Sequence, residues 1–377
     1  MKALVVTTSI VLLALLAIIG WLAVSPGPGG GSPVVTLAVK PPPKPKPKPP
    51  QPAAPPGIDL PPGFGISPQP QKAPGKPGAA QQEAANAAVP TPLPEPPESE
   101  TASIQLVAAP VEALVEESRY GPLPKVAPDG RRPLEVYARP SRYAAKPTPG
   151  GPPRVALLVS GMGMSDPDTT EAVLKLPAPV SVSYSAYGRN LQDGVDRARA
   201  AGHEVLLQIP LEPADYPKND PGPHTLLTTL PPAENMKRLQ WLMSRFTGYV
   251  GVTNSMGAKF ETSVEAFTPV LEEIKARGLL FLDDGSVPKS EGGKIAAALG
   301  LDYATANIQV DAVAGNGDIS QALAKLEAAA KEHGTAIGVA TAKPETVKQV
   351  AAWAEQLQGK GVVLIPVSAA IRSQRQS

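Results

Sequence analysis

The sequence predicts an α/β barrel of parallel strands, and three observations support this fold class. From residue 154 onward, short apolar runs alternate with longer amphipathic stretches, which is typical of repeated strand–helix units. Seven or eight such units follow one another, so each helix can cross over between two parallel strands. The turn Ser160-Gly161-Met162-Gly163 lacks the glycine spacing of a nucleotide-binding open sheet. We therefore expect a barrel, complete or distorted.

The individual elements follow from the spacing of apolar residues, which repeats every second residue in a half-buried strand and about every 3.6 residues in an amphipathic helix. Apolar runs of strand length occupy residues 155–159, 180–184, 204–209, 249–253, 279–282, 308–310, 336–340 and 362–366. The intervening amphipathic stretches predict helices at residues 168–174, 191–201, 233–246, 264–277, 294–299, 319–332 and 344–357.

Composition divides the chain into two regimes. Most of its 48 prolines lie between residues 26 and 153, in a stretch too poor in aromatic and β-branched residues to offset its ordering entropy by burial. We expect a disordered proline-, lysine- and alanine-rich linker at 26–105, a lead-in segment packing on the barrel at 106–153, and the folded domain at 154–377. The linker is either a spacer that lets the domain reach the cell wall or an unselective tether.

The N-terminus predicts a membrane anchor. Residues 3–24 form an apolar run long enough to span a bilayer. Pro26 directly follows the nearest small-residue site and disfavours cleavage as a signal peptide, which is the alternative. Because Lys2 is the lone flanking cation, the positive-inside rule leaves the N-terminus in the cytoplasm. We expect a signal anchor at 1–25 in the cytoplasmic (inner) membrane, with the C-terminal domain in the periplasm.

Charge and cysteine content exclude several classes of function. The net charge of +1 gives no basic excess for a nucleic-acid partner. The absence of cysteine excludes disulfides, thiolate zinc sites and cysteine nucleophiles. The sequence also contains neither an HExxH motif nor a Ser-His-Asp frame.

Polar clusters follow the predicted strands, at the end of a barrel where active sites lie. These clusters carry a resemblance to the divergent polysaccharide deacetylase family of bacterial envelope proteins. The runs that carry it are GHEVLLQIPLEPADYPKNDPGPHTLL at 202–227, GYVGVTNSMGAKF at 248–260 and RGLLFLD at 277–283. The resemblance covers residues 109–368. It implies the distorted (β/α)7 barrel of carbohydrate esterases and a role in metabolism of cell-wall or exported glycan.

The resemblance also implies a chemistry, from which this chain departs. In the wider superfamily a metal-bound water hydrolyses an N-acetyl group, with an Asp-Asp pair after strand one and two His ligands beyond a Gly-His-Glu run. Here Ser160-Gly161 stands in place of the acidic pair, and Gln208 and Glu212 stand in place of the two His ligands. A later His is also absent from residues 338–344. A neutral amide and one carboxylate make a poor zinc site.

The candidate site residues follow from this frame. Glu212 and Asp283 are the candidate catalytic carboxylates, although Glu212 could instead fix its loop by hydrogen bonds. Gln208 and Glu212 are the candidate ligands of a divalent metal such as zinc. The candidate substrate-binding residues are His203, Glu204, Tyr184, Tyr187, Tyr216, Asn254 and Asp284. His203 precedes its strand, so a structural role is the favoured alternative for it.

Two functions remain open from the sequence. The favoured one is recognition of N-acetylated glycan or peptidoglycan by a barrel with a degenerate catalytic site. The alternative is an active, metal-dependent deacetylase of N-acetylated glycan.

Overall fold

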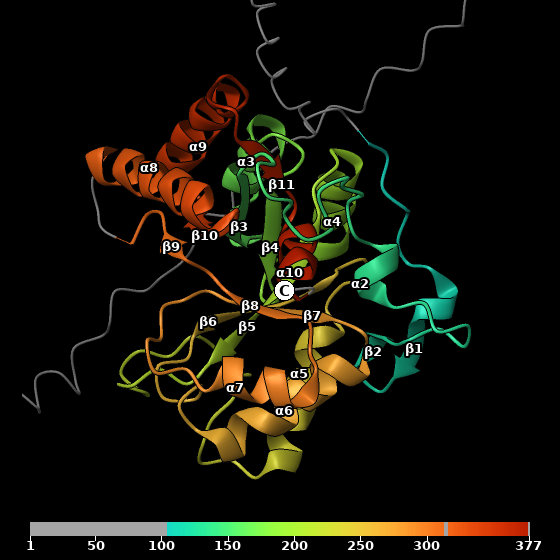
Figure 1. Ribbon diagram of the computed structural model, residues 1–377. Coiled ribbons are helices and arrows are strands. Elements are labelled where there is room, and N and C mark those ends of the chain that lie inside the picture. Colours follow the sequence, from blue (N-terminus) through green and yellow to red (C-terminus); the bar gives the residue numbers. More distant parts are fainter. Residues whose placement is uncertain (1–103, 313–315, 376–377) are drawn as a thin grey trace, which may run out of the picture. The chain divides into compact units, whose positions relative to one another are not determined.

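The computed structural model describes residues 104–312 and 316–375 (Figure 1). The predicted anchor at 1–25 lies outside these residues, as does all but the end of the predicted linker at 26–105. Within the two described ranges, no helix is both long and apolar enough to cross a membrane.

A parallel sheet forms the centre of the domain, built from the apolar runs of the sequence. Its strands are β3 (Arg154–Met162), β4 (Ser181–Ser185), β5 (Val205–Leu211), β6 (Gly251–Met256), β7 (Leu280–Asp283), β8 (Tyr303–Thr305), β9 (Ile308–Gln309), β10 (Thr335–Thr341) and β11 (Val363–Ile365). Their order is β8-β7-β6-β5-β4-β3-β10-β9, and β11 pairs with the first half of β3. Every pairing in this sheet is parallel. The parallel, barrel-like α/β fold predicted from the sequence is confirmed.

The barrel is distorted where one strand position is shared by β8 and β9. β8 pairs with β7, whereas β9, three residues further on, pairs with β10. Between them, the Ala306 N–H donates to the Asp283 carbonyl at 2.8 Å and the Asn307 N–H donates to the Ile337 carbonyl at 2.7 Å. The segment 303–309 therefore connects the two ends of the sheet. The sequence predicted a strand at 308–310 and missed β8.

Helices surround this sheet, and each overlaps a predicted helix (Figure 1). They are α3 (Asp166–Lys175), α4 (Leu191–Ala200), α5 (Pro232–Met243), α6 (Val264–Ala276), α7 (Gly292–Leu299), α8 (Asn316–His333) and α9 (Pro344–Leu357), followed by the short turn η2 (Gln358–Lys360). Local signals set their ends: the Ser165 and Ser263 hydroxyls accept N–H groups in the first turns of α3 and α6. Gly300 ends α7 with a φ of +67°.

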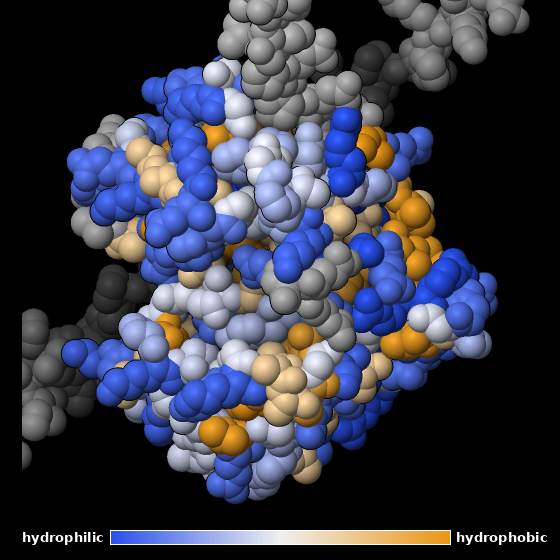
Figure 2. Space-filling model, viewed as in Figure 1, coloured by the Kyte–Doolittle hydropathy of each residue, from blue (hydrophilic) through white to orange (hydrophobic). Residues whose placement is uncertain are grey.

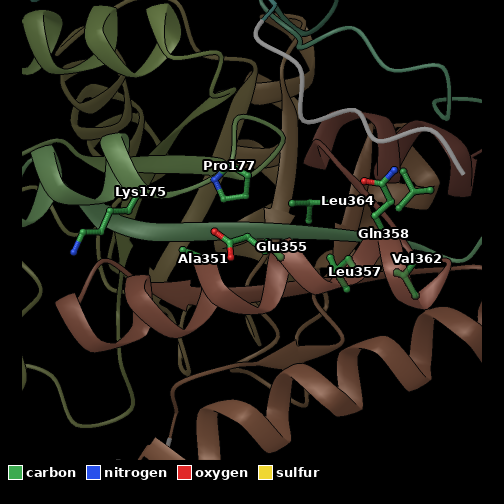
Figure 3. Close-up of a pocket in the computed structure, with 10 residues that line it drawn as sticks. Lys175, Pro177, Ala351, Glu355, Leu357, Gln358, Val362 and Leu364 are labelled. Atoms are coloured by element: carbon green, nitrogen blue, oxygen red, sulfur yellow. The ribbon is translucent and has the colours of Figure 1, made fainter. Parts of the chain in front are cut away.

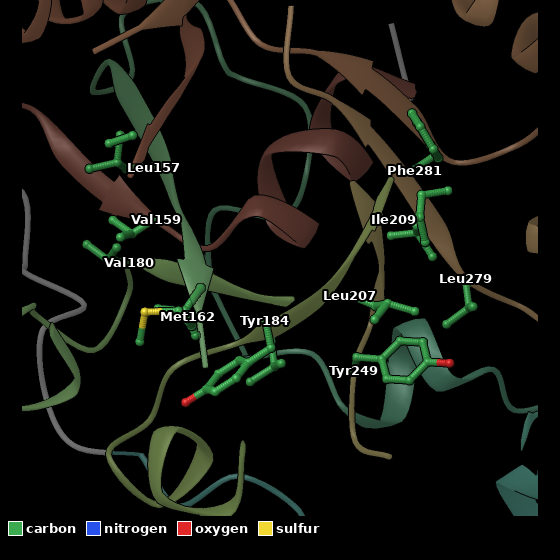
Figure 4. Packing of buried hydrophobic residues seen from close by; sticks show 14 of the residues in the cluster. Leu157, Val159, Met162, Val180, Tyr184, Leu207, Ile209, Tyr249, Leu279 and Phe281 are labelled. Carbon is green, nitrogen blue, oxygen red and sulfur yellow. The ribbon is translucent and has the colours of Figure 1, made fainter. Parts of the chain in front are cut away.

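The strands are buried on both faces, as parallel strands of a barrel are. In β3, Leu157 and Val159 face the surrounding helices, whereas Ala156 and Leu158 belong to a second, inner cluster. Figure 4 shows part of the outer layer, with Leu207 on β5 and Phe281 on β7. This alternation tells which side chains point to the interior of the barrel.

A helix that the sequence did not predict closes the N-terminal end of the barrel. In α10 (Val367–Arg375), the side chains of Val367, Ala369, Ala370 and Ile371 belong to the inner apolar cluster. The Val367 N–H donates to the Ser181 hydroxyl at 3.0 Å, inside the barrel. The helix therefore fills the end of the barrel at which the strands begin.

The lead-in segment packs at the same end. It contains η1 (Glu112–Leu114), the antiparallel pair β1 (Val115–Ser118) and β2 (Gly121–Pro124), and α2 (Pro133–Val136). The buried Arg199 guanidinium donates to the carbonyl oxygens of Val107, Tyr137 and Gly248 at 2.6, 3.1 and 2.9 Å. This arginine ties the lead-in to the start of β6.

Hydrophilic residues cover much of the face shown in Figure 2, and apolar residues lie in separate patches between them. Exposed large apolar side chains in the described ranges include Met164 and Met256, which follow β3 and end β6. Both therefore lie toward the C-terminal end of the barrel.

Candidate functional site

The inner face of the barrel becomes polar toward the C-terminal ends of its strands. The alternation that turns Leu158 and Leu206 inward also turns Ser160, Ser183, Ser185, Gln208, Thr253 and Ser255 inward. Gln208 pairs in register with Ser185 on one side and Thr253 on the other. The C-terminal end thus presents a layer of uncharged hydroxyl and amide groups.

Several of these side chains have no hydrogen-bond partner among the described residues. The Ser183 and Thr253 side chains are 0% and 1% exposed, and within the described residues their hydroxyls make no hydrogen bond. A buried unsatisfied polar group costs about 1–3 kcal/mol. Elsewhere in this layer, the half-buried side chains of Gln208 and Ser255 also lack a hydrogen bond to any described residue. This end of the barrel therefore has spare hydrogen-bonding capacity.

Glu212, the candidate metal ligand and catalytic carboxylate, is fully engaged by the protein. The Lys259 ammonium donates to its Oε1 at 2.7 Å, and the Thr228 N–H and hydroxyl donate to its Oε2 at 2.6 and 2.7 Å. Burial alone would raise the pKa of Glu212, but these donors bring its pKa below the usual value. Its carbonyl also accepts the Lys259 and Phe260 N–H groups. Glu212 thus fastens the loop after β5 to the loop after β6.

The residues present do not fit a zinc ion. No group of three or more His, Cys, Asp or Glu side chains in the described ranges is arranged to hold a metal. Gln208 offers only a neutral oxygen, and the Glu212 oxygens already accept from Lys259 and Thr228. Ser160 donates its hydroxyl to the Ala340 carbonyl at 2.9 Å and supplies no anionic ligand.

The two aspartates at the end of β7 lie in different environments. Asp283 is 0% exposed and accepts the Tyr303 hydroxyl at 2.6 Å and the Gly285 N–H at 2.8 Å. Asp284 is only half-buried and accepts the Ser286 N–H at 2.8 Å. Burial is the main cause of a raised pKa at Asp284. Of this pair, Asp284 is the carboxyl that solvent reaches.

Sequence reasoning missed Glu261, the most unusual carboxyl of this end. Its side chain is 0% exposed, and neither oxygen has a hydrogen-bond partner among the described residues. Burial and the nearby Asp283 raise the pKa of Glu261 to about 9. The carboxyl is therefore protonated at neutral pH. Because Glu261 lies in a polar loop segment, its sequence context gives no signal of burial.

Asn254 is buried and binds the backbone at the end of β6 and just after β7. Its Nδ2 donates to the Met256 carbonyl at 2.9 Å, and its Oδ1 accepts the Asp284 N–H at 2.8 Å. It thereby positions Asp284 beside the end of β6. Met256 has a φ of +61°, a left-handed conformation that costs a residue with a Cβ roughly 1–2 kcal/mol.

His203 and Glu204 lie at the opposite end of the barrel and are 0% exposed. The ring nitrogens of His203 lie 2.8 Å from the Val180 carbonyl and 3.3 Å from the Val173 carbonyl. Burial lowers the pKa of this imidazole, which is therefore neutral. Glu204 binds Ser368 at the start of α10. Both contribute to closing the N-terminal end, and neither reaches the polar layer.

The three candidate tyrosines also differ. Tyr184 is 0% exposed, donates to the Gly194 carbonyl at 2.8 Å and packs in the outer core. Tyr187 is half-buried, and its hydroxyl accepts the His224 N–H at 3.1 Å. The His224 ring is stacked on Trp241 with centroids 3.6 Å apart. Tyr216 is half-buried in the loop after β5.

A separate groove of about 300 Å³ lies far from the polar layer (Figure 3). Its walls come from the end of α3, from α9 and from β11, and include Pro177, Leu357 and Leu364. These residues mark the end of the barrel at which the strands begin. The groove therefore does not belong to the candidate site.

The family follows from a comparison with known proteins. The sequence model described as divergent polysaccharide deacetylase matches residues 157–371, more than half of the chain. The chain belongs to the divergent polysaccharide deacetylase family. The matched range of this divergent polysaccharide deacetylase domain includes the polar layer, Glu261 and most of α10.

Relatives of this deacetylase-family domain occur in bacteria. The uncharacterized protein YibQ of Escherichia coli K12 is 22% identical over 195 residues, which are 52% of this chain and 60% of the relative. A Haemophilus influenzae protein is 23% identical over 47% of this chain and 62% of its own length. The chain thus spans about three fifths of each of these relatives.

A solved structure has the same fold. The uncharacterized protein ATU2773 of Agrobacterium tumefaciens C58 is 40% identical and superimposes with a TM-score of 0.63. The match covers 66% of this chain and 99% of that one.

Proposed function

We propose that this protein recognises N-acetylated glycan, of the cell wall or of an exported polysaccharide, at the C-terminal end of its barrel. The observation that carries the proposal is the pair of half-buried, uncharged side chains of Gln208 and Ser255, which make no hydrogen bond to any described residue. Hydroxyl and amide groups match the hydroxyls and acetamido groups of a sugar, since both sides can donate and accept. Membership of the family supports a glycan as the ligand class.

The same residues argue against deacetylase turnover. A metal-assisted hydrolysis needs a base and several converging ligands. In this chain Ser160 and Gln208 occupy positions where the superfamily frame requires charged or imidazole groups. Glu212 is held by Lys259 and Thr228. Glycan binding without hydrolysis is therefore the function that this site supports best.

The proposal includes where the protein acts, which is at the periplasmic side of the cytoplasmic membrane. A signal anchor at residues 1–25 would hold the protein in the cytoplasmic membrane, and the linker at 26–105 would let the domain reach glycan in the periplasm. At ~3.1 Å per residue, an extended linker of this length could span roughly 200 Å or more.

Calorimetric titration of the full-length protein with chitin oligosaccharides and peptidoglycan fragments tests the proposal. We expect binding that Gln208→Ala weakens, because the variant removes a free carboxamide from the polar layer. Gln321→Ala, on the exposed side of α8, is the matched control and should bind as the wild type does. No measurable binding to any of these glycans would remove the proposal.

The same samples distinguish recognition from catalysis. Incubation with each glycan and added Zn²⁺ should release no acetate. Release that is lost in Glu212→Gln would replace the proposal with the alternative, an active metal-dependent deacetylase.

A further inference from the structure

The groove between α3, α9 and β11 contains a strand edge that has no partner strand. β11 pairs with β3 along one edge and, among the described residues, with no strand along the other. The Val363 N–H donates to the Pro153 carbonyl at 2.9 Å, on the β3 side. Because successive residues of a strand direct their N–H and C=O groups to opposite edges, those of Leu364 point away from β3. Leu364 also lines the groove, so its backbone can pair with an incoming strand.

The walls around this open edge are mostly apolar. Pro177, Leu357 and Leu364 line the groove, and Glu355 lies beside them (Figure 3). Leu174, near the end of α3 and next to a residue of the groove wall, is 79% exposed. An apolar groove with an open strand edge suits an extended peptide, whose backbone pairs with the edge while its side chains fill the groove.

The described part of the chain starts beside this groove. The Ile104 carbonyl oxygen and the Ala178 Cβ both lie against Gly202, 3.5 and 3.1 Å from the place that a Cβ would take there. Ala178 directly follows Pro177, a residue of the groove wall. The chain that precedes Ile104, which lies outside the described residues, is thus attached next to the groove.

One segment of that preceding chain has the sequence pattern of an edge strand. Residues 89–95 read Val-Pro-Thr-Pro-Leu-Pro-Glu, with a proline at every second position. In an extended conformation the N–H groups of Val89, Thr91 and Leu93 would lie along one edge, and the prolines, which have no N–H, along the other. The lysine–proline alternation at 44–49 has the same spacing but puts charged side chains at the pairing positions. Only 89–95 therefore matches an apolar groove.

We propose that residues 89–95 add to the open edge of β11 as a further strand, with the side chains of Val89 and Leu93 in the groove. The contact fastens the linker to the end of the barrel at which the strands begin. It leaves residues 26–88 as the free tether and directs the polar layer away from the point of attachment. This inference does not depend on glycan binding.

An antiparallel direction fits the groove. In an antiparallel pair, residues whose N–H and C=O groups face each other also place their side chains on the same face of the sheet. The Leu364 side chain belongs to the outer cluster, on the side of α9, so those of Val89 and Leu93 lie there as well. A segment in this direction runs back toward Ile104. The eight residues 96–103 that connect them can span up to about 25 Å.

The test measures cross-linking in the full-length protein, which contains no cysteine. Glu95→Cys is combined with Gln358→Cys, at an exposed residue of the groove, or with Ala200→Cys, at an exposed residue two positions before Gly202 and hence close to Ile104. An undocked linker would reach both positions with a similar effective concentration. We expect a short bismaleimide to link position 95 to position 358 about tenfold faster than to position 200, after correction for the labelling rate of each single thiol.

Two further variants show whether strand pairing is the cause. Thr91→Pro removes an N–H from the pairing edge and should lower the excess rate about threefold or more, as expected for loss of one hydrogen bond. Pro92→Ala leaves that edge unchanged and should keep the excess. Equal rates at positions 358 and 200, an excess that Thr91→Pro does not lower, or its loss in both variants would overturn the proposal. Links between two molecules instead of within one would assign the groove to a second copy and also overturn it.

Discussion

The Glu204 carboxyl group binds Ser368, 164 residues further along the chain, through both of its oxygens. The Ser368 N–H donates to Oε1 at 2.9 Å, and the Ser368 hydroxyl donates to Oε2. The Arg139 N–H and the Ser181 hydroxyl also donate to this carboxyl, at 3.2 and 3.3 Å. Glu204 therefore joins the start of β5, the lead-in and α10 at one buried point. The conspicuous Gly-His-Glu run closes the barrel at the end opposite to the candidate site.

Glu204→Ala should lower the free energy of unfolding by about 3 kcal/mol or more, because it leaves several buried donors without an acceptor. Glu204→Gln keeps one acceptor and should cost less. Chemical denaturation of both variants checks this. Glu117→Gln, on an exposed strand position, is the control and should change little. A Glu204→Ala variant of wild-type stability would show that α10 does not depend on this contact.

Glu212→Gln should destabilise the domain by about 1–3 kcal/mol, since it weakens the hydrogen bonds that fasten the loops after β5 and β6. The loss should be the same with and without a chelator, because the carboxylate binds Lys259 and Thr228. Melting curves of wild type and variant with EDTA or Zn²⁺ measure this. A chelator effect that is present in wild type and absent in the variant would instead identify Glu212 as a metal ligand.

Glu261 should make stability fall as pH rises. The pKa of Glu261 in the folded state is about 9, above its ordinary value of 4.5, so between these values the folded state holds a proton that the unfolded state has lost. Each pH unit in this window then costs up to about 1.4 kcal/mol. Relative to wild type, Glu261→Gln should gain stability as pH rises from 5 to 8. Urea denaturation at both values measures the difference, and parallel pH profiles would contradict it.

We expect residues 1–25 to anchor the protein in the cytoplasmic membrane, with its C-terminal domain on the periplasmic side. In cell fractions, the full-length protein should accompany the inner membrane, and protease added to spheroplasts should digest its C-terminal domain. Deletion of residues 1–25 should leave the protein in the cytoplasm. A mature N-terminus near residue 25 would show instead that the segment is a cleaved signal peptide.

The sequence was sufficient to predict those helices and strands that are long enough to show their hydrophobic period within one continuous run of residues. The apolar run 155–159 and the amphipathic run 264–277 predicted β3 and α6, because strand and helix periods are local properties. β8 was missed because three residues are too few to show a period. α10 was missed because a short helix inside a barrel is recognisable only once the barrel encloses it.

The same distinction applies to the candidate site, where some features follow from the residue types and others depend on the folded structure. The sequence alone determined the family resemblance, the parallel α/β fold and the loss of the superfamily's acidic pair and His ligands, since each can be read from residue types in order. Only the tertiary structure decided that Glu204 anchors α10, that Lys259 forms an ion pair with Glu212, and that the Glu261 carboxyl is buried with no hydrogen-bond partner among the described residues. The physical reason is that burial and charge pairing depend on neighbours brought together from distant parts of the chain. For the same reason, only the folded chain shows that Met256 is strained and exposed.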